Sequence, residues 1–224
     1  MAEILTPLQK EIIKIFASID ETKNFYLTGG TALAEFYLQH RLSEDIDIFT
    51  PEEELILYVV DRFTQKLKDS GFDVDISRRF KTFCEIFVNK AQQINKIHIA
   101  CDSPFRFEQP KETELGIKVD GLMDLATNKL LTVFGRAELK DFIDVFFLVK
   151  EKKIVLLDLV EKSMEKDPGL DGYFLAIAFE QVKKIPDEIE KLPVTMLKPV
   201  DMTELKEFFI NSAMQLMDKG IKRK

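Results

Sequence analysis

The sequence contains no tryptophan, only two cysteines and no apolar run of membrane-spanning length. Cys84 and Cys101 stand far apart, so we predict two reduced thiols in the core rather than a disulfide framework. The longest apolar run near the middle, residues 55–60, is far shorter than the ~20 residues of a transmembrane helix. Near the start, an acid and a proline stand where a secretory signal is basic and then apolar. We therefore expect a cytoplasmic protein without a membrane partner.

Positive charge is also scarce, because 32 lysines and arginines face 39 aspartates and glutamates, which gives a formal net charge of −7. Nucleic acid is normally met by a cationic face, so this deficit argues against indiscriminate nucleic-acid binding. Short basic clusters, such as Arg78, Arg79 and Lys81, are more often solvated surface. Hydrophobic residues make up 46% of the chain and charged residues 32%, a balance typical of a globular protein.

The periodicity of apolar residues changes near residue 120. Before that point, short aromatic and β-branched runs alternate with amphipathic segments. They predict strands at 24–28, 45–50, 72–77, 82–89, 96–101 and 116–119, and helices at 7–20, 31–41 and 52–70. After Gly121 the period is helical throughout, with helices expected at 122–134, 137–150, 154–166, 172–184 and 203–219. The sequence therefore predicts an α/β domain at 1–120 and a helical domain at 121–224.

Two aspartates occupy alternate positions of the strand predicted at 45–50. Side chains two residues apart on a strand point to the same side, so Asp45 and Asp47 converge while Ile46 and Ile48 enter the core. Neighbouring carboxylates repel each other unless a cation lies between them, and hard oxygen ligands suit Mg²⁺. We therefore predict that Asp45 and Asp47 are metal ligands.

A glycine pair ends the preceding predicted strand. A turn from a strand into a helix exposes backbone N–H groups, and Gly29 and Gly30 lack the Cβ atoms that would keep phosphate oxygens away. Thr31 adds a hydroxyl donor. The following helix, about eleven residues at ~1.5 Å each, can return the chain so that the turn and the carboxylates meet. Phosphate donors beside a metal site predict phosphoryl chemistry.

Each half of this pattern has an ordinary structural explanation when it occurs alone. A glycine pair is usually a turn, and an Asp-x-Asp pair, such as Asp73 and Asp75, is usually a solvated strand face. The ordered combination of Gly-Gly-Thr, a helix, Arg-x-Ser and Asp-Ile-Asp is more specific and favours the functional interpretation.

That combination resembles the first motif of the AbiEii/AbiGii-like nucleotidyltransferases, which are toxins of prokaryotic toxin–antitoxin and phage abortive-infection systems. The resemblance covers about residues 25–148. A later pattern also matches, with lysine at 140 where arginine is usual; its residues are Lys129, Arg136, Lys140, Asp141 and Asp144. The resemblance implies an α+β nucleotidyltransferase fold, with a mixed β-sheet, flanking helices and a C-terminal helical region.

The resemblance also implies ligands and roles. Mg²⁺ and a nucleoside triphosphate are expected, with tRNA as acceptor and a cognate antitoxin as partner. Arg41, Ser43 and Lys129 are expected to contact the nucleotide, and Asp141 to belong to the same site. Without the resemblance, Lys129 would be interpreted as an exposed helix lysine.

One position departs from the family pattern. The family typically places a third carboxylate in a Lys-Ile-Asp-like strand, but this chain reads Lys96-Ile97-His98. A neutral imidazole can accept a proton near pH 7 but cannot supply negative charge to metal ions. We therefore assign His98 as the provisional catalytic base, with a strand-surface histidine as the alternative. Asp102, farther along the same strand, is expected to be structural, with partial compensation for the missing acid as the alternative.

The leading hypothesis is Mg²⁺-dependent transfer of a nucleoside monophosphate from a triphosphate to an acceptor hydroxyl. Because of His98, a second hypothesis is that the chain binds nucleotide without turnover and acts as a regulatory module. A third hypothesis is transfer to a protein or an antibiotic-like small molecule.

Overall fold

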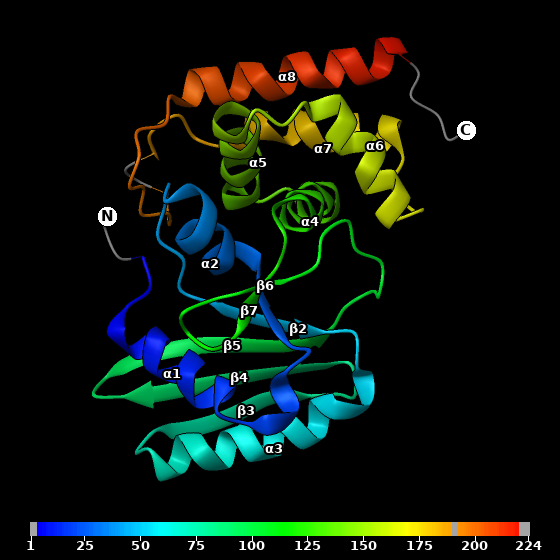
Figure 1. The fold of residues 1–224 in the computed structure, drawn as a ribbon. Helices are drawn as coiled ribbons and strands as arrows, with labels where there is room; N and C mark the ends of the chain where they lie inside the picture. Colours follow the sequence, from blue (N-terminus) through cyan, green and yellow to red (C-terminus); the bar gives the residue numbers. More distant parts are fainter. Residues whose placement is uncertain (1–3, 190–191, 220–224) are drawn as a thin grey trace. The chain divides into compact units, whose positions relative to one another are not determined.

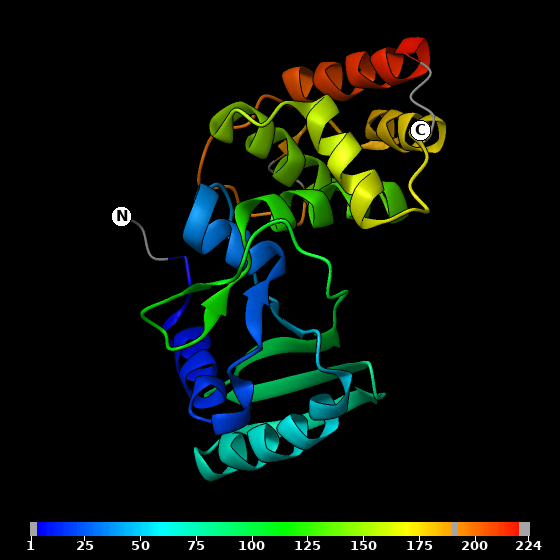
Figure 2. The same ribbon diagram turned by 45° about the vertical axis from the view of Figure 1, so that its right-hand side comes forward.

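The computed structural model describes residues 4–189 and 192–219, and its contacts divide the chain into two compact units. Unit 1 comprises Met1–Gln39 and Ser43–Leu122, and unit 2 comprises His40–Leu42 and Met123–Lys224. The change from unit 1 to unit 2 after Leu122 lies close to the change of periodicity in the sequence. The assignment of His40–Leu42 to unit 2 was not predicted. Both units are drawn in Figures 1 and 2.

Unit 1 is built on a seven-stranded mixed sheet with the order β3-β4-β5-β2-β1-β7-β6. Its strands are β1 Tyr26–Thr28, β2 Ile46–Thr50, β3 Asp73–Arg79, β4 Phe83–Lys90, β5 Gln93–Cys101, β6 Lys111–Glu112 and β7 Lys118–Val119. The predicted meander is confirmed, since β3, β4 and β5 pair antiparallel. Strand β2 pairs parallel with β5 and antiparallel with β1. β6, only two residues long, was not predicted.

The helices of unit 1 are α1 Pro7–Ala17, α2 Gly29–Leu33 and α3 Glu53–Asp69, with short helices η1 Asp20–Thr22 and η2 Ala34–Leu38. Helix α1 begins with a capping box. The Thr6 hydroxyl accepts a bond from Gln9 N at 3.1 Å, and the Gln9 side chain accepts one from Thr6 N at 2.9 Å. Beyond the end of α3, Gly71 adopts a φ of +81°, the left-handed conformation that glycine allows.

The core of unit 1 lies on the face of the sheet that α3 covers, and α1 packs against α3. Figure 1 shows α3 running along β3 and β4. Alternate strand residues are fully buried there, including Ile46, Ile48, Cys84, Ile86, Ile97 and Ile99. The residues between them point to the opposite face and are polar; they are Asp47 of β2, Glu85 of β4 and His98 of β5. Of the two free cysteines, Cys84 is buried as predicted, whereas Cys101 is only partly buried.

The helix after β1 differs from the prediction of 31–41. It begins at Gly29 and continues as a wider π-type helix that ends at Leu38. Gln39 then turns left-handed with a φ of 51°, and its N–H donates to Ala34 O at 2.9 Å. The chain therefore leaves the helix before Arg41.

Unit 2 contains helices α4 Leu122–Gly135, α5 Leu139–Lys152, α6 Leu156–Lys166, α7 Gly172–Glu180 and α8 Met202–Lys219, with the short helix η3 Gln181–Lys184. Phenylalanine rings link three of them, because Phe209 of α8 lies 4.8 Å from Phe142 of α5 and 5.1 Å from Phe179 of α7, measured between ring centroids. Over the described parts of the chain, no helix is both long and apolar enough to cross a membrane.

Candidate active site

Asp47 lies against the glycine turn. It is the register partner of Thr28 across β1 and β2, directly beside the point where Gly29 begins α2. A Cβ atom added to Gly29 would lie 2.0 Å from Oδ2 of Asp47, and Gly29 adopts a φ of +69°. Only glycine combines this backbone conformation with so close an approach of a carboxylate. The turn and one of the two acids are therefore in direct contact.

Each aspartate faces a basic side chain of the neighbouring strand β5. Asp45, just before β2, has its Oδ2 3.2 Å from Nζ of Lys96. Asp47 is the register partner of His98, and its Oδ1 lies 2.9 Å from His98 Nδ1. The aspartate side chains are 33% and 21% exposed, so both carboxylates are open to solvent.

Glu85 is a site residue that the sequence did not reveal. On β4 it is the register partner of His98, and its Oε2 lies 3.2 Å from His98 Nε2. The hydrogen bond to Asp47 raises the pKa of His98, with a further contribution from Glu85 and against the effect of burial. The pKa of Glu85 is lowered, chiefly because Ser77 Oγ donates to it at 2.6 Å. Asp47, His98 and Glu85 are brought together by the register of β2, β5 and β4. The periodicity of residues along a single strand does not predict this register.

The expected hydroxyl donor to phosphate has another partner. Thr31 is 2% exposed, and its hydroxyl donates to the main-chain oxygen of Asp45. The short helix α2 lies against β2, which brings this hydroxyl to the strand. Thr31 therefore fixes α2 to Asp45, and only its main-chain N–H is left for the predicted role. Ser43 is partly exposed, and its main-chain oxygen accepts a bond from Gln9 Nε2 at 3.1 Å.

Asp102 belongs to a network behind the glycine turn, as the structural interpretation predicted. Its Oδ2 accepts bonds from the Tyr26 hydroxyl at 2.8 Å and from Arg106 at 3.0 Å. Arg106 also binds buried Asp120 at 2.6 Å, and Asp120 accepts a bond from the Thr28 hydroxyl at 2.9 Å. The network fixes the ends of β1 and β7, and so supports the turn at Gly29.

Within unit 2, the predicted nucleotide contacts Arg41 and Lys129 are buried and bound to Asp144. Arg41 makes two bonds to this carboxylate, Nε to Oδ1 at 2.7 Å and Nη2 to Oδ2 at 2.8 Å. Lys129 Nζ lies 2.8 Å from Asp144 Oδ2, and its side chain is only 8% exposed. The interpretation of Lys129 as an exposed helix lysine is therefore wrong. The guanidinium of Arg41 is bound to Asp144 rather than free for a nucleotide. Asp144, fully buried, is the centre of this cluster, and the cations hold its pKa well below the ordinary range.

Asp141, the other acid predicted for the site, is also fully buried in unit 2. Arg136 donates to it from Nε at 2.7 Å and from Nη2 at 2.9 Å, and Lys129 Nζ lies 3.9 Å away. Lys140, where the family usually has arginine, points to Glu138 at 3.3 Å instead. The second motif thus forms one connected ionic cluster.

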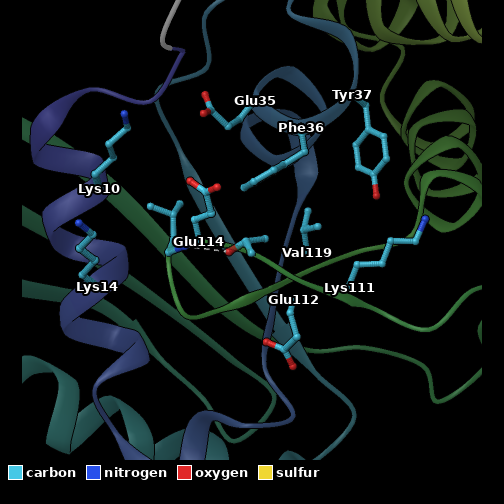
Figure 3. A pocket seen from close by; sticks show the side chains of 11 residues that line it. Lys10, Lys14, Glu35, Phe36, Tyr37, Lys111, Glu112, Glu114 and Val119 are labelled. Carbon is cyan, nitrogen blue, oxygen red and sulfur yellow. Dashed lines mark hydrogen bonds between the residues drawn. The ribbon is translucent and has the colours of Figure 1, made fainter.

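Unit 1 also has a cavity of about 630 Å³ that contains none of the predicted site residues. Figure 3 shows Lys10 and Lys14 of α1 on one side, Glu35, Phe36 and Tyr37 of η2 above, and Lys111, Glu112 and Glu114 near the β6–β7 hairpin. Burial raises the pKa of Tyr37 to about 12, and its hydroxyl donates to Asp120 O at 2.8 Å. The positive charges of the lysines that line the cavity are balanced by the negative charges of its glutamates, so the charge of the cavity does not favour an anionic nucleotide.

Known proteins resemble this chain along most of its length. An uncharacterized protein of Aquifex aeolicus (strain VF5), aq_aa25, is 30% identical over 170 residues, which cover 73% of this chain and 76% of that protein. The crystal structure of JHP933 from Helicobacter pylori has a TM-score of 0.62 and 21% identity, covering 95% of this chain and 90% of that one.

MenT4, the nucleotidyltransferase toxin Rv2826c from Mycobacterium tuberculosis H37Rv, has a TM-score of 0.64 and 15% identity, covering 94% of this chain and 82% of that one. These likenesses confirm the predicted nucleotidyltransferase fold. A family model described as "Nucleotidyl transferase AbiEii toxin, Type IV TA system" matches residues 14–219. Because this match spans nearly the whole sequence, the chain belongs to the AbiEii family of nucleotidyltransferase toxins.

Proposed function

We propose that this nucleotidyltransferase moves a nucleoside monophosphate from a triphosphate to an acceptor hydroxyl, at a site built on Asp45 and Asp47. The observation that carries the proposal is the contact between Asp47 and Gly29, where an added Cβ would lie 2.0 Å from the carboxylate. It places an acid beside a turn whose N–H groups suit phosphate. Because Asp47 allows only glycine at position 29, the turn has no side chain there to cover its main-chain N–H groups.

Asp45 and Asp47 fit Mg²⁺ as its protein ligands. Mg²⁺ is typically bound by one or two carboxylates together with substrate phosphates, rather than by a cage of protein groups. The side chains of Asp45 and Asp47 are 33% and 21% exposed, so both carboxylates are open to an ion that arrives with the phosphates. Among the described residues, no group of three or more His, Cys, Asp and Glu is arranged to hold a metal ion. When bound, the ion would supply positive charge to the triphosphate.

The first turn of α2 supplies the donors for phosphate. Gly29, Gly30 and Thr31 are its first three residues, and N–H groups in a first helical turn have no partner within the helix. In this proposal these main-chain groups bind the triphosphate, and the hydroxyl of Ser43 adds a side-chain donor. The Thr31 hydroxyl keeps Asp45 in place.

His98 accepts the proton of the attacking hydroxyl in this proposal. It lies 2.9 Å from Asp47 and is 20% exposed, so the ring is next to the proposed ligands and accessible to an acceptor. Lys129, Arg41 and Asp141 have a supporting role, since each is buried in the ionic cluster of unit 2. That cluster keeps His40–Leu42, the three residues that connect two segments of unit 1, in a defined conformation.

The test is transfer of label from radioactive nucleoside triphosphates in the presence of Mg²⁺ and total tRNA. We expect transfer by the wild type, loss of transfer in Asp45→Ala, and normal transfer in Asp73→Ala, which changes an exposed aspartate of β3. Equal transfer by wild type and Asp45→Ala would refute the assignment of the carboxylates.

The acceptor and the partner are also part of the proposal. The family's description as a toxin of a type IV toxin–antitoxin system supports a cognate antitoxin as partner. The choice of tRNA as acceptor rests on the resemblance given in the sequence analysis, and the net charge of −7 implies that any RNA contact is local. A protein or an antibiotic-like small molecule is the alternative acceptor. Parallel reactions with tRNA, protein extract and small molecules distinguish these classes by the species that becomes labelled.

Binding without turnover is a second candidate, favoured by one observation. Both ring nitrogens of His98 already face carboxylates, Asp47 at 2.9 Å and Glu85 at 3.2 Å. A ring so engaged is a poor acceptor for a further proton. Calorimetry that shows Mg²⁺-dependent triphosphate binding, with no transfer to any acceptor, would support this candidate. A gain of transfer in His98→Asp would show that the missing acid limits the activity.

A further inference from the structure

Two phenylalanine side chains lie on the open face of the sheet in unit 1, the face opposite α3. On β4, Cys84 and Ile86 are buried in the core on the side of α3. Phe83 and Phe87 occupy the alternating positions of the same strand and therefore point to the open face, where both rings are partly exposed. This is the face that carries Asp47.

Strand register connects both rings with the proposed active site. Phe87 is the register partner of Lys96, whose Nζ lies 3.2 Å from Asp45. The ring of Phe83 lies 5.5 Å from the ring of His98, measured between centroids. Phe83 and Phe87 are four residues apart, which corresponds to about 13 Å along a strand. The aromatic surface is therefore continuous with the acids and long enough for two separate planar groups.

The order of the strands decides which substrate these rings face. Gly29 follows β1, Asp47 lies on β2, and β5 and β4 continue the sheet on the other side of β2. In phosphoryl transfer, the attacking and leaving oxygens are roughly in line, with the phosphorus between them. With the triphosphate bound at the glycine turn, pyrophosphate leaves on the side of β1. The acceptor hydroxyl must then approach from the side of β5 and β4, where the two rings lie.

The charge of the open face does not suit a phosphate backbone. Its acidic side chains outnumber its basic ones, with Asp45, Asp47, Asp75 and Glu85 on the acidic side and Lys96 and Arg78 on the basic side. An acceptor that lies here is held better through uncharged planar groups than through phosphates. Nucleobases have such planes, they stack on aromatic side chains, and some β-sheets bind single-stranded RNA in this way.

We propose that Phe83 and Phe87 form a stacking platform for the unpaired bases at the 3′ end of an RNA acceptor, whose terminal hydroxyl then lies beside Asp45 and Asp47. The proposal rests on the transfer reaction proposed above, and it names single-stranded RNA as the acceptor rather than a protein or a small molecule. Stacking of bases does not require a cationic surface, so it is compatible with the net charge of −7.

The competing explanation is that the two rings only pack against His98 and Lys96 and stabilise the sheet. Cross-strand pairs that include an aromatic ring do contribute to stability. A ring with this role alone would change the melting temperature when it is removed, but it would not change the affinity for RNA. Its effect also would not depend on whether the RNA carries bases.

The first measurement is the binding of a short, 5′-fluorescent single-stranded RNA in the presence of Mg²⁺, followed by anisotropy. We expect Phe83→Leu and Phe87→Leu each to weaken binding by about fivefold or more, which is the strength of base–aromatic stacking. Phe83→Tyr and Phe87→Tyr keep the ring and should bind as the wild type does. The control is Tyr58→Leu, which removes an exposed ring from α3 on the other face and should bind normally. Unchanged binding in both leucine variants would overturn the proposal.

The second measurement changes the RNA instead of the protein. The same oligonucleotide with abasic sugars at its last two positions keeps its phosphates and hydroxyls but has no bases there to stack. The wild type should bind this RNA at least about fivefold more weakly than the intact one. Phe83→Leu should weaken the binding of the abasic RNA no further, because the two changes remove the same contact. Equal binding of intact and abasic RNA by the wild type would overturn the proposal.

Turnover distinguishes this proposal from the proposed function. In transfer to RNA, the two leucine variants should raise KM for the RNA by about fivefold or more and leave KM for the triphosphate unchanged. Label on proteins or small molecules but not on RNA would overturn the stacking platform and leave the transfer reaction intact. Base-dependent RNA binding without transfer to any acceptor would support the platform and refute the transfer reaction.

Discussion

The two units treat their carboxylates in opposite ways. In unit 1, Asp45 and Asp47 are 33% and 21% exposed, and each faces a single basic side chain of β5. In unit 2, Asp141 and Asp144 are completely buried. Asp144 by itself binds three basic side chains. They are Arg41, Lys129 and His40, and Nε2 of His40 lies 2.7 Å from the carboxylate.

This contrast in burial distinguishes an acid that stabilises the fold, such as Asp144, from acids that can bind a cation, such as Asp45 and Asp47. A buried charge loses its hydration, so it must be matched by cations and hydrogen bonds within the protein, as Asp144 is. Two aspartates on one strand face repel each other and stay partly hydrated, which leaves lone pairs for a cation from solution. We therefore expect substitutions of Asp45 and Asp47 to affect activity, and substitutions of Asp141 and Asp144 to affect folding.

The largest expected effect is on transfer by Asp47→Asn. Removing a metal ligand removes transition-state charge stabilisation worth several kcal/mol, so we expect kcat to fall by about 10³-fold. The melting temperature should change little, because relief of the repulsion between the two acids offsets the loss of the bond to His98. Asp73→Asn, the same change on exposed β3, should alter neither quantity. A fold that fails to form in Asp47→Asn would erase the distinction between the two units.

The complementary change in unit 2 is Asp144→Asn. It leaves Arg41 and Lys129 buried without their anion, and breaking a buried ion pair typically costs about 3–5 kcal/mol. We expect that loss in the free energy of unfolding, measured by urea denaturation. The control is Asp158→Asn, which changes an exposed acid in the first turn of α6 and should cost less than about 1 kcal/mol. Equal stability of the two variants would show that the cluster does not stabilise unit 2.

A pair of glycines offers a smaller and sharper comparison. Gly29 and Gly71 both have positive φ, +69° and +81°, but a Cβ would strike Asp47 at Gly29 and would meet nothing within 4 Å at Gly71. Gly71→Ala should therefore cost only the backbone strain, about 1–2 kcal/mol. Gly29→Ala should cost more and should also weaken triphosphate binding, measured by calorimetry. Similar losses of stability and normal binding in both variants would mean that the contact with Asp47 is unimportant.

Local patterns were sufficient for most of the fold. When α7 is taken together with η3, which continues it to Lys184, the helices of unit 2 begin and end within two residues of their predicted bounds, because apolar residues at helical spacing were interrupted by clear breaks such as Pro168-Gly169. The prediction failed where a contact distant in sequence decides the structure. The helix after β1 starts at Gly29, where the Thr31 hydroxyl binds the main-chain oxygen of Asp45, and the two-residue strand β6 is paired with β7.

For the site as well, the sequence could predict what depends on neighbouring residues but not what depends on contacts distant in sequence. Alternation along one strand placed Asp45 and Asp47 together, since both lie within three residues. Glu85 was missed because its relation to His98 depends on the register of two strands. The burial of Arg41 and Lys129 was missed because Asp144, more than a hundred residues after Arg41, had to be placed beside them. Ionic partners that are distant in sequence leave no local signal.

The two histidines give the smallest test of the comparison, because their pKa values shift in opposite directions. Burial lowers the pKa of His40 from its ordinary 6.5, and the hydrogen bond to Asp47 raises that of His98. Below pH 6.5 the unfolded chain protonates at His40 before the folded one, so this residue's contribution to stability is present above 6.5 and is lost on acidification. His98 contributes stability below pH 6.5, and this is lost as the pH rises through its folded pKa.

For one proton the slope is at most about 1.4 kcal/mol per pH unit. Urea denaturation between pH 5.5 and 7.5 without Mg²⁺ should show a smaller loss on the acid side in His40→Gln than in the wild type. In His98→Gln the acid-side loss should remain and become steeper, because the opposing contribution is gone. Parallel curves for all three proteins would mean that neither histidine is coupled to folding, and the buried cluster around Asp144 would then not exclude a proton from His40.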